Sequence, residues 1–239
     1  MFRLDLTLDT PAANLALDEA LLEAAEAGEG PGQVLRLWES TEDAVILGRA
    51  SKYQQETHFE VCQQNGVAIL RRCSGGASVM IGPGCLMYAV VLSYEAMPFL
   101  QQLDQAHQYV MQHLVTALES LAIPVEWKGT CDLTLHDRKF SGNSLRCKKS
   151  HLLYHGTLLY DYDLSKIQRY LSTPPRQPEY RLQRQHDDFV TNLSSTRRQL
   201  ETALIDAWGA DEILQVLPQQ RSAELQQEKY ERDDWNQRL

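Results

Sequence analysis

The side chains best suited to chemistry in this sequence fall in three short polar segments, each set against an apolar run. The first is RRCSGGASVM, residues 71–80, where two arginines precede a pair of glycines. Guanidinium groups bind phosphate or carboxylate in a bidentate manner, and glycine lets backbone N–H groups turn toward an anion. The segment therefore predicts an anion site; a tight turn with surface arginines is the alternative.

The two arginines are expected to have different surroundings. Arg71 and Arg72 directly follow the strand-like run VAIL, and side chains on a strand alternate between its faces. We expect one arginine to enter the site and the other to reach solvent or an ion pair, while Ser74 can cap or donate a hydrogen bond. The Walker and Rossmann glycine patterns are both absent, which disfavours the two large nucleotide-binding classes that use them.

The second segment is GTCDLTLHDRKFSGNSLRC, residues 129–147, where a lysine precedes a Ser-Gly-Asn turn. On a strand, the side chain of Lys139 points away from those of Arg138 and Phe140. An ammonium group held beside a glycine turn can stabilise charge that develops on a carboxylate or phosphate oxygen. A solvated lysine in a hairpin is the alternative.

The third segment is His155-Gly156-Thr157, which interrupts the apolar run LLYHGTLLY. A glycine inside a strand often marks a bulge, or a close approach by a ligand or by another backbone. For His155 taken alone, a hydrogen-bonded histidine in the core is the interpretation that we favour.

Composition and charge limit the classes of protein. The 239 residues suit one large domain or a domain with an appendage, with 43% apolar and 23% charged residues. A net charge of −9 argues against non-specific binding to nucleic acid or to an anionic membrane. The N-terminus has no apolar signal-peptide core and no run of about 18 apolar residues occurs, so we expect a cytoplasmic protein. Five cysteines without CxxC spacing disfavour a disulfide framework or a structural zinc site.

Periodicity predicts the elements that must position these segments. Helical spacing of apolar residues predicts helices at 12–27, 54–65, 99–122, 163–171, 194–209 and 222–239. Apolar or alternating runs predict strands at 34–40, 43–49, 67–72, 85–94, 123–127, 131–142 and 151–164. We expect the strand at 85–94 to be central and covered on both faces, and a hairpin turn at His136 and Asp137.

The mixture of strands and helices, without strict alternation, predicts an α+β fold with a mixed β-sheet flanked by helices. We expect one domain at 1–190, followed by a short helical C-terminal extension at 191–239 that is not an independent domain. The proline- and arginine-containing segment 173–190 is either a solvated linker, which we favour, or a loop that closes over a site with Arg181, Arg184, His186 and Asp187.

Taken together and in this order, the segments resemble the lipoate–protein ligase A and octanoyltransferase family, which shares its catalytic fold with biotin–protein ligases. The resemblance covers roughly residues 12–164. The matching stretches are LRLWES, VILGR, RRCSGG (71–76), GTCDL (129–133), DRKFSGNS (137–144) and HGTLLYDYDL (155–164). Each stretch is weak alone, but the combination is specific.

The resemblance implies a biotin/lipoyl ligase-like catalytic domain. Such an enzyme forms an acyl-AMP from ATP, with Mg²⁺, and lipoate or octanoate, and then passes the acyl group to a lysine. The expected partners are lipoyl domains of 2-oxoacid dehydrogenase complexes or the glycine cleavage H protein. Two alternatives stay open: ATP-independent octanoyl or lipoyl transfer between carrier domains, and a non-catalytic lipoate-binding member of the fold.

The resemblance also implies roles for single residues. Lys139 would be catalytic, bridging the acyl carbonyl and the α-phosphate, and Arg72 would contact the nucleotide phosphate. The residues expected to bind the nucleotide and the acyl-adenylate are Arg72, Ser74, Gly75, Gly76, Ala77, Ser78, Val79, Met80, Asp132, Ser141, Gly142 and Asn143. The acyl-pocket residues would be His155, Gly156 and Thr157, and no metal-ligating residue is expected.

The sequence departs from the family pattern at four positions. Ala77 stands where a third glycine is usual, Ile81 where histidine is frequent, and Cys85 and Cys131 where asparagine is common. We expect weaker ligand contacts at these places. A thiol near Lys139 would have a lowered pKa and could act as an acyl nucleophile. We favour a small, inert substitution at Cys131.

Overall fold

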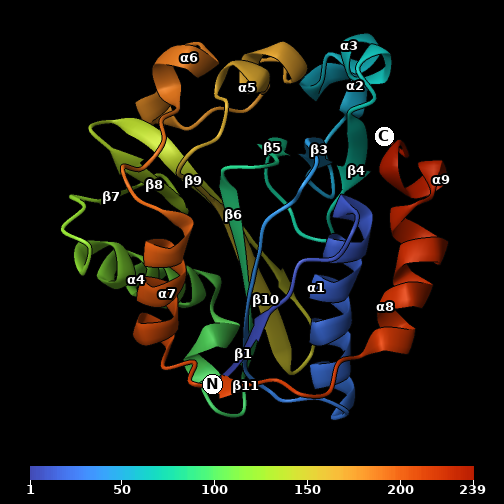
Figure 1. The fold of residues 1–239 in the computed structure, drawn as a ribbon, viewed down its shortest axis with the longest axis vertical. Helices are drawn as coiled ribbons and strands as arrows, with labels where there is room; N and C mark the ends of the chain where they lie inside the picture. The colour runs from blue at the N-terminus through green and yellow to red at the C-terminus, as the bar shows by residue number, and fades with distance from the viewer.

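A computed structural model describes residues 1–239, and its strands form two mixed sheets (Figure 1). The larger sheet has eight strands in the order β11-β1-β2-β6-β10-β9-β8-β7, and the smaller has three in the order β4-β3-β5. The strands span Phe2–Asp5 (β1), Val34–Trp38 (β2), Ala44–Leu47 (β3), Ala68–Arg71 (β4), Val79–Ile81 (β5), Cys85–Ser93 (β6), Glu126–Lys128 (β7), Asp132–Leu135 (β8), Arg138–Cys147 (β9), His151–Leu159 (β10) and Glu212–Ile213 (β11).

Helices cover both faces of the larger sheet. α1 and α8 lie together on one face, and α4 and α7 lie together on the other (Figure 1). The helices span Pro11–Ala27 (α1), Tyr53–Glu56 (α2), Phe59–Gln64 (α3), Leu103–Glu119 (α4), Ser165–Tyr170 (α5), His186–Phe189 (α6), Arg197–Trp208 (α7), Gln219–Leu225 (α8) and Asp233–Asn236 (α9). Single 3₁₀ turns occur at Pro98–Gln101 and Glu179–Arg181, and a π-helical turn at Gln226–Tyr230. None of these helices is long and apolar enough to cross a membrane.

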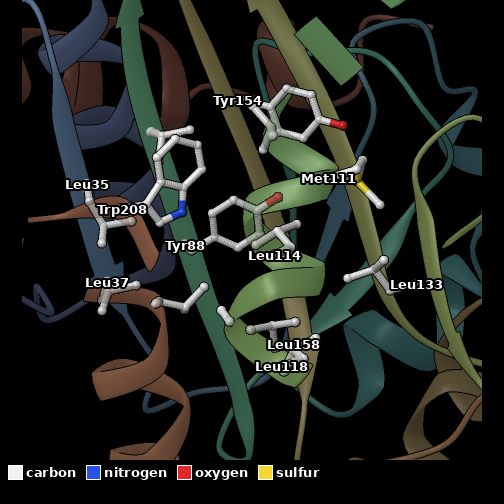
Figure 2. Close-up of a cluster of buried hydrophobic side chains, with 14 of the residues drawn as sticks. Leu35, Leu37, Tyr88, Met111, Leu114, Leu118, Leu133, Tyr154, Leu158 and Trp208 are labelled. Atoms are coloured by element: carbon white, nitrogen blue, oxygen red, sulfur yellow. The ribbon is translucent and has the colours of Figure 1, made fainter. Parts of the chain in front are cut away.

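The largest hydrophobic cluster fills the space between the larger sheet and the α4–α7 pair. Leu37 of β2, Tyr88 of β6 and Leu158 of β10 project toward Leu114 of α4 and Trp208 of α7 (Figure 2). A second cluster joins α1 to the smaller sheet and to α5. The two clusters lie on opposite faces of β6, whose nine residues are all buried, so the prediction of a central, doubly covered strand is confirmed.

The predicted helix at 12–27 is also confirmed, and its ends follow the local chemistry. Thr10 accepts a hydrogen bond from the N–H of Ala13 at 3.1 Å, and Gly28 ends the helix in the left-handed region at φ +73°. The hairpin between β8 and β9 turns at His136 and Asp137, as predicted, with φ of +49° and +61°.

Other elements were not predicted from the sequence or are more broken than it predicts. β1 and β5 were not predicted, because they have only four and three residues and pair with strands distant in the chain, so they leave little local periodicity. The helix predicted at 222–239 breaks between its π turn and α9. The break lets the Asn236 amide reach β4, where its Oδ1 accepts from the N–H of Arg71 at 2.9 Å.

Residues of the predicted C-terminal extension pack into the same clusters as the rest of the chain. Leu200, Leu204 and Trp208 of α7 join the cluster beneath α4. On the other face, Tyr230 donates a hydrogen bond to Glu19 of α1 at 2.7 Å. The segment therefore covers both faces of the larger sheet.

Arg71 is fully buried, which differs from the expectation of solvent or an ion pair. Its Nη1 donates to the carbonyls of Gly48 at 2.8 Å and Ser51 at 2.7 Å, and its Nη2 donates to the carbonyl of Asn236 at 2.9 Å. No carboxylate pairs with it. The covering helix α9 comes from the far end of the chain, so the local alternation of strand side chains gave no sign of it.

Glycine is required at position 156 of β10 because a side chain from the neighbouring strand occupies the space of its Cβ. Tyr88, Gly156 and Asn143 are in register on the adjacent strands β6, β10 and β9. Tyr88 donates to Asn143 Oδ1 at 2.5 Å, across the intervening strand. A Cβ at position 156 would lie 1.9 Å from that oxygen. The close approach predicted for Gly156 is therefore made by the Asn143 side chain.

We predict that Asn236→Ala lowers the free energy of unfolding by about 1–3 kcal/mol, because it leaves the buried Arg71 N–H and Tyr230 carbonyl without partners. Urea denaturation measures the change. Gln237→Ala is the matched control, since Gln237 bonds only to exposed Asp233, and it should stay within about 0.5 kcal/mol. Equal losses in both variants would contradict the role given to Asn236.

We also predict that Gly156→Ala destabilises the protein by about 1–3 kcal/mol, because the new methyl group displaces Asn143 and strains the sheet. Gly75→Ala is the control: a Cβ there has no neighbour within 4 Å, so little change is expected. Thermal unfolding of both variants tests the difference. A Gly156→Ala protein as stable as the control would show that Asn143 can move without cost.

Candidate active site

A cavity of about 370 Å³ lies where residues 72–78, which join β4 to β5 and are called here the glycine loop, meet the larger sheet. This volume is within the range of small-molecule sites. Most of the predicted site residues line it. They are Arg72, Gly76, Ala77, Ser78, Val79, Asp132, Lys139, Gly142, Asn143, His155, Gly156 and Thr157. The structure thus brings the three polar segments together around one hollow.

The remaining four predicted residues do not line the cavity. Ser74 is buried and bonds to neighbouring side chains, and the Gly75 carbonyl accepts from Ser144 Oγ at 3.0 Å. Met80 is packed in the cluster under α1, and Ser141 accepts a hydrogen bond from the Asn143 amide at 3.1 Å. These four residues support the lining without forming it.

Arg72 organises the glycine loop while keeping its charge unpaired. Its guanidinium donates to Ser74 Oγ at 3.1 Å, to the Ala77 carbonyl at 3.0 Å and to the carbonyls of Gly75 and Ile46. All these acceptors are neutral. Burial lowers the pKa of Arg72 to about 10, so the group stays protonated at neutral pH. A buried cation without a carboxylate partner, at the wall of a cavity, favours an anionic ligand.

His155 fixes the same loop from the opposite side. Its Nε2 lies 2.5 Å from Ser74 Oγ, and Ser144, its neighbour in register on β9, bonds to the Gly75 carbonyl. Burial, with the nearby Arg72 charge, lowers the pKa of His155 to about 3, so the ring is neutral. The histidine is hydrogen-bonded and buried, as we favoured, and it also lines the cavity.

Lys139 is held in place by a chain of two partners. Its Nζ lies 2.7 Å from Asp132 Oδ1, and Tyr180 donates to Asp132 Oδ2 at 2.7 Å. Burial and the Asp132 charge raise the pKa of Tyr180, so the hydroxyl stays protonated and can donate. A Cβ at Gly142 would lie 2.8 Å from the lysine Nζ, so glycine at this position leaves room for the ammonium group.

Several residues of the lining were not named as site residues from the sequence. The apolar wall is formed by Leu15, Ile46 and Met87, and by Val79, which was predicted to bind the nucleotide and the acyl-adenylate. In the sequence these look like ordinary core residues on a helix and strands. Thr130 and Ser144 also lie in the lining and flank predicted segments.

The segment 173–190 also contributes to the lining, through Arg176, Gln177 and Pro178 and not through the four residues named for a loop that closes over a site. The segment is folded on itself: Arg181 and Arg184 stack on the ring of Phe189, at 4.6 and 5.3 Å from its centre. The favoured interpretation as a solvated linker is therefore wrong. In the sequence, only the prolines and arginines of this segment distinguish it from a solvated linker. Its contact with the site is made by Tyr180 to Asp132, which lies 48 residues earlier in the chain.

The departures from the family pattern have different consequences. Ile81 and Cys85 are fully buried and lie outside the cavity lining, so they remove no contact made there. Ala77 still supplies its carbonyl to Arg72. Cys131 does line the cavity, but its thiol donates to the Asn143 carbonyl at 2.8 Å and burial raises its pKa to about 11. This environment keeps the sulfur protonated.

Comparison with known proteins supports the fold and the family. The chain matches the family model described as the lipoyl protein ligase A/B catalytic domain over residues 10–208. It is 29% identical over 162 residues to a Mycoplasma pneumoniae protein named probable lipoate-protein ligase A. That alignment covers 68% of this chain and 46% of the relative. The chain thus spans about half the length of this curated relative.

Two solved structures share the fold. A bipartite lipoate protein ligase of Thermoplasma acidophilum, studied with its E2 lipoyl domain, superposes with a TM-score of 0.83 at 22% identity, covering 99% of this chain and 96% of that chain. A lipoate-protein ligase A bound with ATP gives a TM-score of 0.84 at 21% identity, covering 99% of both chains. The predicted ligase-like α+β fold is confirmed. Together with the match over residues 10–208, this shows that the chain belongs to the lipoyl protein ligase A/B catalytic-domain family.

Proposed function

We propose that this protein is a lipoate–protein ligase, which activates lipoate or octanoate with ATP and transfers the acyl group to a lysine of a lipoyl domain. One observation carries the proposal: the cavity combines a net positive lining with an apolar wall. Arg72, Lys139 and Arg176 supply three cations against one carboxylate, that of Asp132, in a chain of net charge −9. An acyl-adenylate, an anion joined to an apolar chain, matches both features.

The proposed chemistry has two half-reactions. In the first, a carboxylate oxygen of the acyl substrate attacks the α-phosphorus of ATP, and pyrophosphate leaves. In the second, the acceptor lysine amine attacks the acyl carbonyl, AMP leaves, and the new amide loses a proton. Both steps build negative charge on carbonyl and phosphate oxygens, and we assign its stabilisation to Lys139. The Asp132–Tyr180 pair holds the ammonium in position, which avoids reorganisation during the reaction.

The two ends of the adenylate would lie against different parts of the lining. We assign the phosphate to Arg72 and the nucleotide to the backbone of residues 76–79, which line the cavity. The acyl chain would lie against Leu15, Ile46 and Met87, beside the predicted acyl-pocket residues 155–157. An apolar wall with a few placed polar groups is the usual composition of a site for such a ligand.

ATP would enter as its Mg²⁺ complex. No group of three or more His, Cys, Asp and Glu side chains is placed to hold a metal ion, and Asp132 is already engaged by Lys139 and Tyr180. We therefore treat Mg²⁺ as part of the substrate, neutralising the triphosphate.

The relatives support the choice of substrates. One protein of this fold was solved with ATP, and another was studied with its E2 lipoyl domain. We propose ATP as the activating substrate, and we propose lipoyl domains of 2-oxoacid dehydrogenase complexes or the glycine cleavage H protein as acceptors.

We predict that Lys139→Ala lowers the rate of lipoyl-domain modification at least about 100-fold, because charge on the reacting oxygens loses its cation. Lipoate binding should remain measurable by calorimetry, since the apolar wall is intact. The assay is mass spectrometry of a lipoyl domain after incubation with protein, ATP, Mg²⁺ and lipoate or octanoate.

Lys148→Ala is the matched control, because Lys148 is paired with Glu23 at 3.0 Å, lies just past the end of β9 and does not line the cavity. Its rate should match that of the unmodified protein. A Lys139→Ala variant with an unchanged rate would remove the lysine from the mechanism, whereas wild-type protein that binds lipoate but modifies nothing would indicate a binding protein.

We predict that Cys131→Ser retains transfer activity within about threefold. With a pKa of about 11, only about a thousandth of the thiol is ionised at pH 8, which is a poor acyl nucleophile. The test compares transfer with ATP and free acid against transfer from an acylated carrier protein without ATP. Acyl mass on the wild-type protein without ATP, lost in Cys131→Ser, would establish the ATP-independent alternative instead.

A further inference from the structure

A second hollow adjoins the cavity along the same loop and the same strand. The cavity lining includes Gly76 and Ser144, and the second hollow begins at their neighbours Gly75 and Leu145. We call it the arginine groove. Its lining is Arg49, Ala50, Cys73, Ser74, Gly75, Leu145, Arg146, Cys147, Arg238 and Leu239.

The groove gathers unpaired positive charge in an acidic protein. Arg49, Arg146 and Arg238 come from three distant parts of the chain, and none of them forms an ion pair. No acidic side chain lines the groove. Arg238 Nη2 donates to the Arg49 carbonyl at 2.6 Å, and the nearby Arg49 charge adds to burial in lowering the pKa of Arg238. Like charges thus lie close together, with no acidic side chain between them in the lining.

The groove also has the composition of a protein-binding surface. Arg49, Arg238 and Leu239 are exposed, and Leu145 is half-buried in the same lining. Arginine around a partly apolar centre is typical of protein interfaces, whereas a site for a small anion buries its cation, as Arg72 is buried here. The surface therefore fits a protein partner that brings carboxylates.

We propose that the arginine groove docks an acidic face of the lipoyl domain that receives the acyl group. This inference rests on the proposed function. An acceptor lysine has to enter the cavity, so the body of its domain must lie on the surface beside the cavity. The groove is such a surface, because its lining begins one residue from the cavity lining along both the glycine loop and β9. Carboxylates near the acceptor lysine would supply the ion pairs that the arginines lack, and would speed encounter.

The groove and the cavity are separated by the glycine loop, at Gly75. A partner that docks in the groove therefore contacts the loop that also forms the cavity. Ser144 Oγ holds the Gly75 carbonyl at 3.0 Å, and Arg72 donates to the same carbonyl from the inside. A domain seated in the groove would therefore rest on the loop whose next residues line the cavity.

The test is the affinity for an isolated lipoyl domain, measured by titration calorimetry. R49E/R238E should weaken binding at least about tenfold, and wild-type affinity should fall as KCl is raised, because the contacts are exposed ion pairs. The rate of acyl-AMP formation from ATP and octanoate should stay within about twofold, since neither residue lines the cavity. R146Q is a second variant, which removes the charge of the half-buried Arg146 but keeps a polar side chain, and it should also weaken binding of the lipoyl domain.

R198E is the matched control, an exposed arginine on α7 with no ion pair, and should bind like wild type. Unchanged affinity in the groove variants, or an equal loss in R198E, would overturn the proposal. A change in oligomeric state of R49E/R238E would assign the groove to a second copy of the chain, and would also overturn it. If wild type forms no acyl-AMP but binding still depends on the groove, the ligase chemistry fails and the docking surface stands.

Discussion

The buried charge of Arg72 is the constraint on which the site depends. A guanidinium taken out of water has to replace its hydration, and this one does so with the hydroxyl of Ser74 and backbone carbonyls, two of them from the glycine loop. The loop curls because its carbonyls converge on that group. The same geometry favours glycine at position 76, because its φ is +85° and a Cβ there would lie 2.8 Å from Arg72 Nη2. Because every acceptor is neutral, the full charge remains available to a ligand.

The adjacent arginine anchors the chain at the point where β4 ends and the glycine loop begins. Arg71 ends β4 and points away from the cavity, where it donates to the carbonyls of Gly48, Ser51 and Asn236. The glycine loop is thereby fixed between the larger sheet, through His155 and Ser144, and the last helix of the chain. Residues of the C-terminal segment thus support the site through Arg71, although only Arg238 and Leu239 come near its edge.

Sequence alone predicted the parts of the site that are local. The glycine loop, Lys139 and the strand carrying His155 were found because each combines an unusual residue type with an apolar neighbour over a few positions. Contacts across long separations were not found. The link from Asp132 to Tyr180 spans 48 residues, and that from Arg71 to Asn236 spans 165. The apolar wall was missed for another reason: Leu15 and Met87 have the periodicity of core residues, and only the empty space beside them distinguishes them.

Burial sets the protonation state of two side chains in the cavity lining. The two side chains in the lining that commonly titrate nearest neutral pH, His155 and Cys131, are held neutral by burial, with pKa values of about 3 and 11. The cations Arg72, Lys139 and Arg176 are left facing the single carboxylate of Asp132. The acceptor amine, in contrast, has to lose its proton before it can attack an acyl carbonyl. In the proposed reaction, the acceptor lysine therefore makes transfer depend on pH, and neither His155 nor Cys131 adds to that dependence near neutral pH.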